Sequence, residues 1–327
     1  MSQPALALCI PAYNAAAFIG RLLASAAAQT APFDEVIVCD DASTDDTAAV
    51  AVAHGARVVR NKVNLGCSAS KNQALAAASA DWVHFHDADD VLLPDFTTLA
   101  RRWMSRPDAP DVVLFDYEYR DNASGELLAR PDFDDAALRR DPIRYAILNQ
   151  INSLCGLYRR EKLSKIGGYD TDPEVLYNED VAFHCKLALA GMSFGAEKEI
   201  SIINYRVKNS MSDANRVKCL KSHYAVMRRV AALAGQRYAA EISSRLWAAA
   251  AGLASHLEWA DVDRAITEAM ELNCAVPPNQ SKEFALLCHL AGPRAAFRFR
   301  EYVIRLFKPH LRRRINNQRK IEAAHSS

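Results

Sequence analysis

The sequence predicts an α/β fold, in which helices flank a mostly parallel sheet, followed by a domain made of helices alone. Over the first hundred residues, short apolar runs alternate with stretches of helical periodicity. Strands that are buried on both faces and separated by helices form parallel sheets. After Ser212 such runs end, and apolar residues recur only at helical spacing. We therefore expect one domain at 1–213 and a helical domain at 214–327.

The elements of the first domain are expected at short intervals along the chain. Apolar runs predict strands at 6–10, 36–39, 57–60, 82–85 and 112–119. One-sided apolar spacing and polar starts predict helices at 15–29, 43–53, 68–79 and 180–190. Ser43 and Ser68 are the expected N-caps of the second and third helix. The stretch 122–131 has the composition of a turn region.

Composition and charge describe an ordinary soluble protein. Half of the residues are apolar and 24% are charged. No signal-peptide pattern and no stretch of membrane-spanning length occurs, so a cytoplasmic location is expected. The eight cysteines form no CxxC pair and no zinc-type spacing with histidine, so we expect them to be reduced.

Polar side chains follow the ends of four predicted strands: Tyr13, Asp41, Asn64 and Asp87. Because ligands of such sheets bind at the carboxyl ends of the strands, one crevice is expected to hold all four. Asp87 and Asp89 place two carboxylates in one turn, which suits Mg²⁺ or Mn²⁺ held together with phosphate oxygens. The alternative is an acidic turn that caps the helix starting near Pro94.

Four motifs occur in order at intervals of about 25 residues: IPAYN (10–14), VIVCDDASTDDT (36–47), NLGCSASKNQAL (64–75) and FHDADDVLLPD (85–95). From residue 5 to about 212, this succession resembles the family 2 glycosyltransferases, which are inverting enzymes with a GT-A fold. The resemblance implies a UDP-sugar donor and a divalent metal, Mn²⁺ or Mg²⁺. It also implies transfer of a hexosyl or N-acetylhexosaminyl group to a glycan or lipid-linked acceptor, as in cell-surface polysaccharide synthesis.

The resemblance implies that six residues line the nucleotide and its phosphates: Pro11, Tyr13, Asn14, Asp41, Asn64 and Lys71. Tyr13 flanks the uracil, Asp41 accepts the uracil N3 proton, and Lys71 stands where the family more often has arginine. From their chemistry alone, these three residues have other interpretations. Tyr13 is also suited to a helix start, Asp41 to a helix cap, and Lys71 to a solvated helix face.

The same resemblance assigns the acidic residues. Asp89 is a metal ligand, Asp87 contacts the metal or the ribose, and Asp90 serves the turn. Inversion needs a base that deprotonates the acceptor hydroxyl, and Asp180 matches the aspartate of the family's ED motif, with Glu179 as a supporting acceptor-site residue. The alternative is that both acids simply favour the first turn of a helix.

Two further segments resemble parts of the family. The stretch 203–210 is similar to a YRxRxxS segment, which implies that Arg206, Lys208 and Ser210 contact the diphosphate. A solvated basic turn is the alternative. The stretch 154–170 is expected to border the acceptor pocket.

The segment 294–320 has ten Lys and Arg residues and one acid, a net charge of +9, although the whole chain carries only +1. Pro293 is expected to start a helix there, and Pro309 to end or kink it. A basic amphipathic helix with aromatic residues predicts attachment to the inner face of the cell membrane. Docking on the acidic body, a homodimer surface and a nucleic-acid patch are the alternatives, although nucleic acid is not an expected partner of the chain.

Other classes of nucleotide-binding protein fit the sequence less well. A sugar-phosphate nucleotidyltransferase needs a glycine-rich loop after the first strand, and IPAYNAAAF contains no glycine. A dehydrogenase that binds NAD needs GxGxxG, which is absent for the same reason. A noncatalytic nucleotide-sugar-binding protein predicts loss of the acidic site, whereas Asp87, Asp89 and Asp180 are all present.

Overall fold

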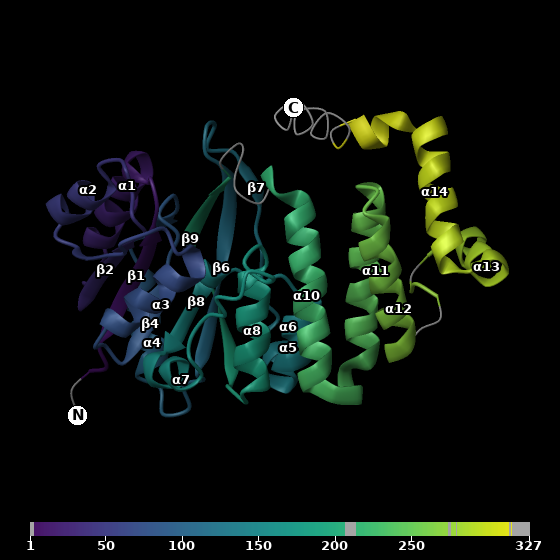
Figure 1. Ribbon diagram of the computed structural model, residues 1–327. Coiled ribbons are helices and arrows are strands. Elements are labelled where there is room, and N and C mark those ends of the chain that lie inside the picture. The colour runs from purple at the N-terminus through teal and green to yellow at the C-terminus, as the bar shows by residue number, and fades with distance from the viewer. Residues whose placement is uncertain (1–2, 207–213, 274–275, 279, 314, 316–327) are drawn as a thin grey trace. The chain divides into compact units, whose positions relative to one another are not determined.

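The computed structural model describes residues 3–206, 214–273, 276–278, 280–313 and 315 (Figure 1). Its contacts divide the chain into two compact units, Met1–Ala214 and Asn215–Ser327. The sequence placed the domain boundary one residue earlier, after residue 213.

Within residues 3–206, nine strands form one mixed sheet in the order β3-β2-β1-β4-β8-β6-β9-β5, with β7 paired to β6. The strands are β1 (Leu6–Ala12), β2 (Glu35–Asp40), β3 (Arg57–Arg60), β4 (Trp82–Phe85), β5 (Val91–Leu92), β6 (Val112–Asp121), β7 (Leu127–Ala129), β8 (Gly156–Arg159) and β9 (Phe194–Arg206). The half that contains β1 to β4 is parallel, as predicted. The other half contains antiparallel pairs, because β8 runs against both β4 and β6.

The centre of the sheet is the centre of this unit's core. All seven residues of β1 and all four of β4 are buried, which requires helices on both faces of the sheet. These helices are α1 (Ala16–Ala27), α2 (Thr47–Ala53), α3 (Cys67–Ala77), α4 (Phe96–Met104), α5 (Asp135–Arg140), α6 (Pro142–Leu148), α7 (Arg160–Lys165) and α8 (Glu179–Leu189), with a 3₁₀ turn η1 (Ser153–Cys155). The predicted α/β fold class is confirmed.

Two predicted helix caps are wrong, and each has a physical reason. The α2 helix begins at Thr47, because the Ser43 hydroxyl accepts a hydrogen bond from the Asn14 backbone N–H instead of capping. The α3 helix begins at Cys67 with Gly66 at its N-cap. Gly66 has a φ of +88°, a conformation that glycine adopts without the strain of a side chain. Ser68 is consequently buried inside the helix.

The C-terminal unit is helical, as predicted (Figure 1). Its helices are α10 (Arg216–Ala234), α11 (Ala239–Ser255), α12 (Trp259–Leu272), α13 (Lys282–Ala291) and α14 (Pro293–Phe307), with 3₁₀ turns η2 (Gly235–Tyr238) and η3 (Pro309–Arg312). The α11 helix packs against α10 and α12. Pro293 is the first residue of α14, and the helix ends two residues before Pro309, as expected. Among the described helices, none is long and apolar enough to cross a membrane.

Candidate functional site

A pocket of about 440 Å³ opens at the carboxyl ends of β1, β2 and β4, where the sequence placed a crevice. Its size is typical of small-molecule sites. Seven residues expected to contact the donor or metal line this pocket: Pro11, Tyr13, Asn14, Asp41, Asn64, Asp87 and Asp89. They come from four separate motifs, so the fold brings together residues that lie as far as 78 positions apart in the sequence.

Tyr13 lies on the pocket wall with 51% of its surface exposed. A large aromatic ring gains free energy when a flat apolar partner covers it. Tyr13 therefore offers a stacking surface for a nucleobase, which agrees with the role that the resemblance implies.

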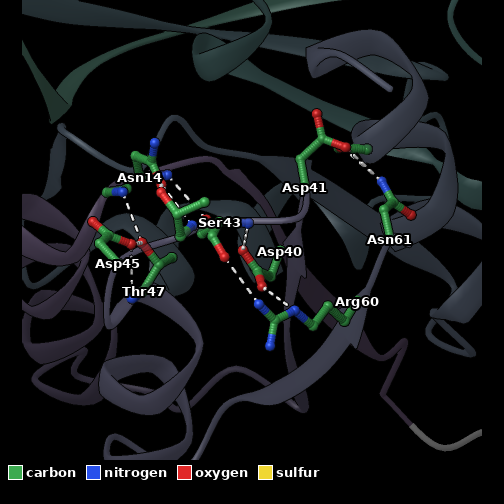
Figure 2. Close-up of polar contacts among 11 residues, drawn as sticks. Asn14, Asp40, Asp41, Ser43, Asp45, Thr47, Arg60 and Asn61 are labelled. Atoms are coloured by element: carbon green, nitrogen blue, oxygen red, sulfur yellow. Dashed lines mark hydrogen bonds and ion pairs between the residues drawn. The ribbon is translucent and has the colours of Figure 1, made fainter. Parts of the chain in front are cut away.

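The two adjacent aspartates after β2 have different surroundings (Figure 2). Asp40 is fully buried and forms an ion pair with Arg60, with 3.0 Å between Oδ2 and Nε. Asp41 lies on the pocket wall, where its Oδ1 accepts hydrogen bonds from the Asn61 Nδ2 and the Leu65 N–H, both at 2.8 Å. Its Oδ2 accepts one from the Gly66 N–H at 2.8 Å. Asp41 caps no helix and instead fixes the loop 61–66.

The loop after β1 is fastened to the turn after β2 (Figure 2). Asn14 has a φ of +47°, and its side-chain Oδ1 accepts a hydrogen bond from the Thr44 N–H at 2.9 Å. Ala15 donates its N–H to the Thr47 hydroxyl at 2.7 Å. Asn14 therefore shapes the pocket chiefly through its backbone, since its side-chain oxygen is already engaged within the protein.

The three carboxylates of the turn after β4 have different surroundings. Asp90 is buried, and it accepts hydrogen bonds from the Asn204 Nδ2 and the Tyr205 N–H, both at 2.7 Å. Asp90 thus fastens the end of β9 as well as the turn. Burial and the charges of Asp89 and Asp87 raise the pKa of Asp90 well above its ordinary value.

Asp87 and Asp89 line the pocket and are more exposed to solvent than Asp90. Burial raises the pKa of both carboxyls; Asp87 adds to the rise at Asp89, and Lys71 counteracts the rise at Asp87. Arg21 donates from Nη2 to the backbone oxygen of Asp89 at 2.5 Å, and its guanidinium lies 4.2 Å from the centre of the Tyr205 ring. Arg21 thereby connects α1 to the acidic turn and to β9.

The chemistry of the donor set fits a divalent cation that is completed by a ligand. Mg²⁺ and related ions in nucleotide sites use one or two protein carboxylates together with phosphate oxygens and water. Asp87 and Asp89 supply two such carboxylates on one pocket wall. No group of three or more His, Cys, Asp or Glu among the residues described could hold a metal ion by itself. The remaining ligands would have to come from a diphosphate and from water.

The structure places Lys71 behind the pocket wall, which differs from both expectations for this residue. Its side chain is 2% exposed, and Nζ donates a hydrogen bond to the Ser153 hydroxyl at 2.7 Å. Nζ also lies 3.7 Å from a carboxylate oxygen of Asp87 and 3.7 Å from one of Asp180. The interpretation of Lys71 as a solvated helix residue is wrong. The contact of Lys71 with phosphates, which the resemblance implies, stays a prediction. The location of Nζ behind the pocket wall does not favour it.

Glu179 and Asp180 occupy the first turn of α8, as predicted. Burial, together with the charge of Asp180, raises the pKa of Glu179 to about 7. The backbone oxygen of Asp180 lies 2.8 Å from the Nδ1 of His184, whose Nε2 lies 2.9 Å from the Tyr158 hydroxyl. These contacts fix the start of α8 against β8.

The other predicted segments are placed in part. Arg206 is the last residue of β9, and its backbone oxygen accepts a hydrogen bond from the Asn122 N–H at 3.2 Å. Lys208 and Ser210 lie outside the described residues. In the segment 154–170, Tyr169 stacks on Phe183 of α8, with 3.8 Å between the ring centres. This segment therefore packs against the helix that carries Glu179 and Asp180.

Several residues of the site were not predicted from the sequence. Asn61 donates hydrogen bonds to Asp41 and Ser70, Cys67 lines the pocket, and Arg21 contacts the backbone of Asp89. Ser153 lies behind the pocket wall, where its hydroxyl accepts a hydrogen bond from Lys71. Asn61 directly follows the strand 57–60, so the rule that polar residues follow strand ends could have found it. Arg21 and Ser153 carry no such signal, because only the tertiary fold brings them to the site.

The comparisons with known proteins agree with this arrangement. Residues 7–167 match the model of glycosyl transferase family 2. An uncharacterized glycosyltransferase of Rickettsia typhi is 27% identical over 185 residues, which is 55% of this chain and 58% of that protein. The chondroitin synthase of Escherichia coli is 36% identical over 100 residues, 29% of this chain and 15% of the synthase. The chain thus spans less than two thirds of the length of these curated relatives.

Two solved structures share the fold. Staphylococcus aureus TarS 1-349, in complex with UDP-GlcNAc, has a TM-score of 0.68 at 18% identity, over 92% of both chains. The mannosyltransferase PcManGT from Pyrobaculum calidifontis, in complex with GDP-Man and Mn²⁺, has a TM-score of 0.56 at 19% identity, over 94% of this chain and 88% of that one. The N-terminal unit of this chain belongs to glycosyl transferase family 2 and has the GT-A fold.

Proposed function

We propose that the chain transfers a sugar from a UDP-sugar to a hydroxyl group of a glycan or lipid-linked acceptor, with inversion at the sugar carbon. The observation that carries the proposal is the pocket in which Tyr13, Asp41, Asp87 and Asp89 meet at the ends of three parallel strands. This pocket offers an aromatic surface, an acceptor for an N–H group, and two carboxylates for a metal. The match to chondroitin synthase supports a role in polysaccharide synthesis.

Each residue has a defined task in the proposed reaction. Tyr13 stacks on the base, and Asp41 accepts its N3–H. Asp87 and Asp89 would hold a divalent cation, whose charge stabilises the departing diphosphate. Asp180 removes the proton of the acceptor hydroxyl as the new bond forms on the face opposite the leaving group. Glu179, whose pKa is about 7, exchanges a proton near neutral pH and supports the acceptor.

The test is release of UDP from a panel of UDP-sugars with Mn²⁺ and candidate acceptors. Asp89→Asn and Asp180→Asn are each expected to reduce turnover by roughly a hundredfold or more. Asp108→Asn changes an exposed carboxylate outside the pocket and is expected to retain full turnover. If Asp180→Asn binds the donor and still transfers at the wild-type rate, the assignment of the base is wrong. If no UDP-sugar is turned over by the wild-type chain, the enzyme proposal fails.

Several basic side chains of α14 and of the turn after it contact acids of the helical unit. Arg298 donates two hydrogen bonds to Asp263, at 3.0 and 2.8 Å. Arg305 and Arg312 both contact the buried Glu301 at 2.9 Å. These arginines were expected to form the charged side of a membrane-binding helix, but their charges are balanced within the helical unit. The pairs favour docking of this side on that unit.

We propose that the other side of α14 carries the membrane contact. Five large side chains there or just beyond the helix are more than half exposed: Phe299, Tyr302, Leu306, Phe307 and Leu311. Apart from Arg305 and Arg312, five Lys and Arg residues and no acid occur between positions 302 and 320 of the sequence. Aromatic and aliphatic residues beside a cationic segment suit a bilayer that contains anionic lipid.

Vesicle flotation tests this contact. Phe307→Ser combined with Leu306→Ser is expected to reduce flotation with anionic vesicles, whereas Leu233→Ser, at an equally exposed position of α10, is expected to leave it unchanged. Equal flotation of all three proteins would contradict the proposal. A concentration-dependent dimer that the double substitution abolishes, without any flotation of the wild type, would assign the surface to a second copy of the chain.

A further inference from the structure

A buried cation lies between two carboxylates that belong to different halves of the proposed site. The Nζ of Lys71 is 3.7 Å from Asp87 on the donor side and 3.7 Å from Asp180 on the acceptor side. Asp87 follows β4 and Asp180 lies in the first turn of α8, so one side chain of α3 connects two carboxylates that are 93 residues apart in the sequence.

The surroundings of Lys71 keep it charged and fixed. The Ser153 hydroxyl accepts its hydrogen bond at 2.7 Å, and the centre of the Tyr169 ring lies 5.1 Å away. Two carboxylate oxygens, each 3.7 Å from Nζ, supply the negative charge that a buried ammonium group requires. A buried lysine with this set of partners has little freedom to swing into the pocket.

Asp87 and Asp180 both place a carboxylate oxygen beside this buried cation, although each carboxylate is itself partly exposed. The side chain of Asp87 is 36% exposed and that of Asp180 is 20% exposed. The Asp180 oxygen that faces Lys71 is buried and accepts no hydrogen bond from the described residues. Removing one partner of a buried charge cluster leaves the others uncompensated, which is strongly destabilising.

We propose that Lys71 is a positioning residue: it holds the donor-side Asp87 and the base Asp180 at a fixed separation, without contacting the nucleotide itself. This inference rests on the proposed function for the meaning of the two carboxylates, but the ion-paired cluster is a property of the fold alone. It differs from a phosphate contact, in which the ammonium group would have to line the donor pocket. Lys71 is not among the residues that line that pocket.

Binding and turnover separate the two roles. Without metal, a lysine that contacts phosphate directly contributes strongly to UDP affinity. We expect Lys71→Met to change UDP affinity in EDTA, measured by calorimetry, by less than about threefold. With Mn²⁺ and saturating UDP-sugar, we expect kcat to fall by roughly a hundredfold, because Asp180 is no longer held against the acceptor. A loss of UDP affinity in EDTA of about tenfold or more, or an unchanged kcat, would overturn the proposal.

Two matched variants test whether the charge itself matters. Lys71→Arg keeps a cation behind the pocket and is expected to recover part of the lost kcat. Ser153→Ala removes only the hydrogen bond at 2.7 Å and leaves both ion pairs, so its kcat is expected to stay within about threefold of the wild type. If Ser153→Ala lowers kcat as much as Lys71→Met does, the separation of the carboxylates is not set by the charge of Lys71.

A stability measurement tests the same contacts without using activity. Lys71→Met leaves Asp87 and Asp180 facing each other, so adding Asp180→Asn should raise the melting temperature of the Lys71→Met protein. If Lys71→Met does not fold alone, recovery of folding in the double variant is the supporting result. A double variant that melts below Lys71→Met, or that also fails to fold, would overturn the proposal. If the wild-type chain is inactive, the proposed function fails. The comparison of melting temperatures still tests whether Lys71 holds the two carboxylates.

Discussion

At the scale of single residues, Ala42 in the turn after β2 has a backbone conformation that a residue with a Cβ atom disfavours. Ala42 has a φ of +60°, in the left-handed region. A residue with a Cβ pays roughly 1–2 kcal/mol there, whereas glycine does not. The motif DDAS thus places alanine at a position whose backbone conformation favours glycine. The strain is local to the wall of the donor pocket, since Ala42 follows Asp41 directly.

Ala42→Gly is accordingly expected to stabilise the protein by about 1 kcal/mol, after allowance for the extra freedom of glycine in the unfolded chain. Urea denaturation measures the change. The control is Ala49→Gly in the exposed part of α2, where glycine is expected to cost about 0.5–1 kcal/mol. Equal destabilisation by both substitutions would show that Ala42 is not strained.

Glu179 predicts a dependence of stability on pH. Its pKa is raised to about 7 from an ordinary value of 4.5. Between these values the folded protein holds a proton that the unfolded chain has released, so stability falls as pH rises through this window. Glu179→Gln removes the loss and is expected to be more stable than the wild type by about 2 kcal/mol near pH 8, with no gain near pH 4.

Urea denaturation across this pH range checks the expectation for Glu179. Glu161→Gln is a suitable comparison, because Lys165 lowers the pKa of the exposed Glu161 carboxyl and the sign of the effect is reversed. A Glu179→Gln protein that loses stability at high pH would contradict the raised pKa.

At the scale of elements, the loop 61–66 joins β3 to α3 and forms one wall of the pocket. Gly66 combines two roles there, since it starts α3 with a positive φ and donates its N–H to Asp41 at 2.8 Å. The same two roles explain why Ser68 was not the cap. The local sequence allows either serine or glycine to start the helix, and the hydrogen bond to Asp41 decides for Gly66.

Gly66→Ala is expected to cost about 1–2 kcal/mol of stability and to weaken UDP binding. Gly125→Ala is the matched control, because Gly125 has a φ of +72° and also has open space around the position of a Cβ, but lies in the turn between β6 and β7. We expect similar thermal destabilisation in both variants and a loss of UDP affinity in Gly66→Ala alone. Equal UDP affinities of the two variants would show that the loop 61–66 does not contribute to UDP binding.

The sequence predicts some elements better than others for physical reasons. The strands 36–39, 57–60 and 82–85 are apolar runs with helices between them, and each is close to its observed bounds. The strand β5 has only two residues, and β8 is the short stretch GLYR, so neither shows a period. The burial of Lys71 was not predicted because α3 has little amphipathic character and buries polar side chains such as Ser68 and Ser70.

At the scale of the molecule, each unit holds buried charged groups in place with ion pairs. In the helical unit this is Glu301, which is 2% exposed and contacts Arg305 and Arg312. The stacking of Phe297 on Trp247, with 6.0 Å between ring centres, anchors the same helix to α11. The basic segment 294–320 therefore begins within an integral helix of this unit.

Glu301→Gln is expected to lower the stability of the helical unit by about 2 kcal/mol, because two arginines then lose their counter-charge. Differential scanning calorimetry measures the transition. Glu283→Gln, at an exposed position in the first turn of α13, is expected to change it by less than about 0.5 kcal/mol. Similar transitions for both variants would mean that Glu301 contributes no more than a surface acid.

Asp41 also has a consequence for which nucleotides the chain can use. A carboxylate has about four acceptor positions, and the loop 61–66 occupies three of those of Asp41. The fourth acceptor position can accept a hydrogen bond, but a carboxylate has no hydrogen to donate. Uracil offers N3–H to it, whereas cytosine presents a lone pair at N3, so CDP is expected to bind roughly a hundredfold more weakly than UDP. Competition between the two nucleotides measures this ratio, and equal affinities would remove Asp41 from base recognition. Under the proposed function, the hydrogen bonds that shape the loop thereby also restrict which nucleotide bases Asp41 can accept.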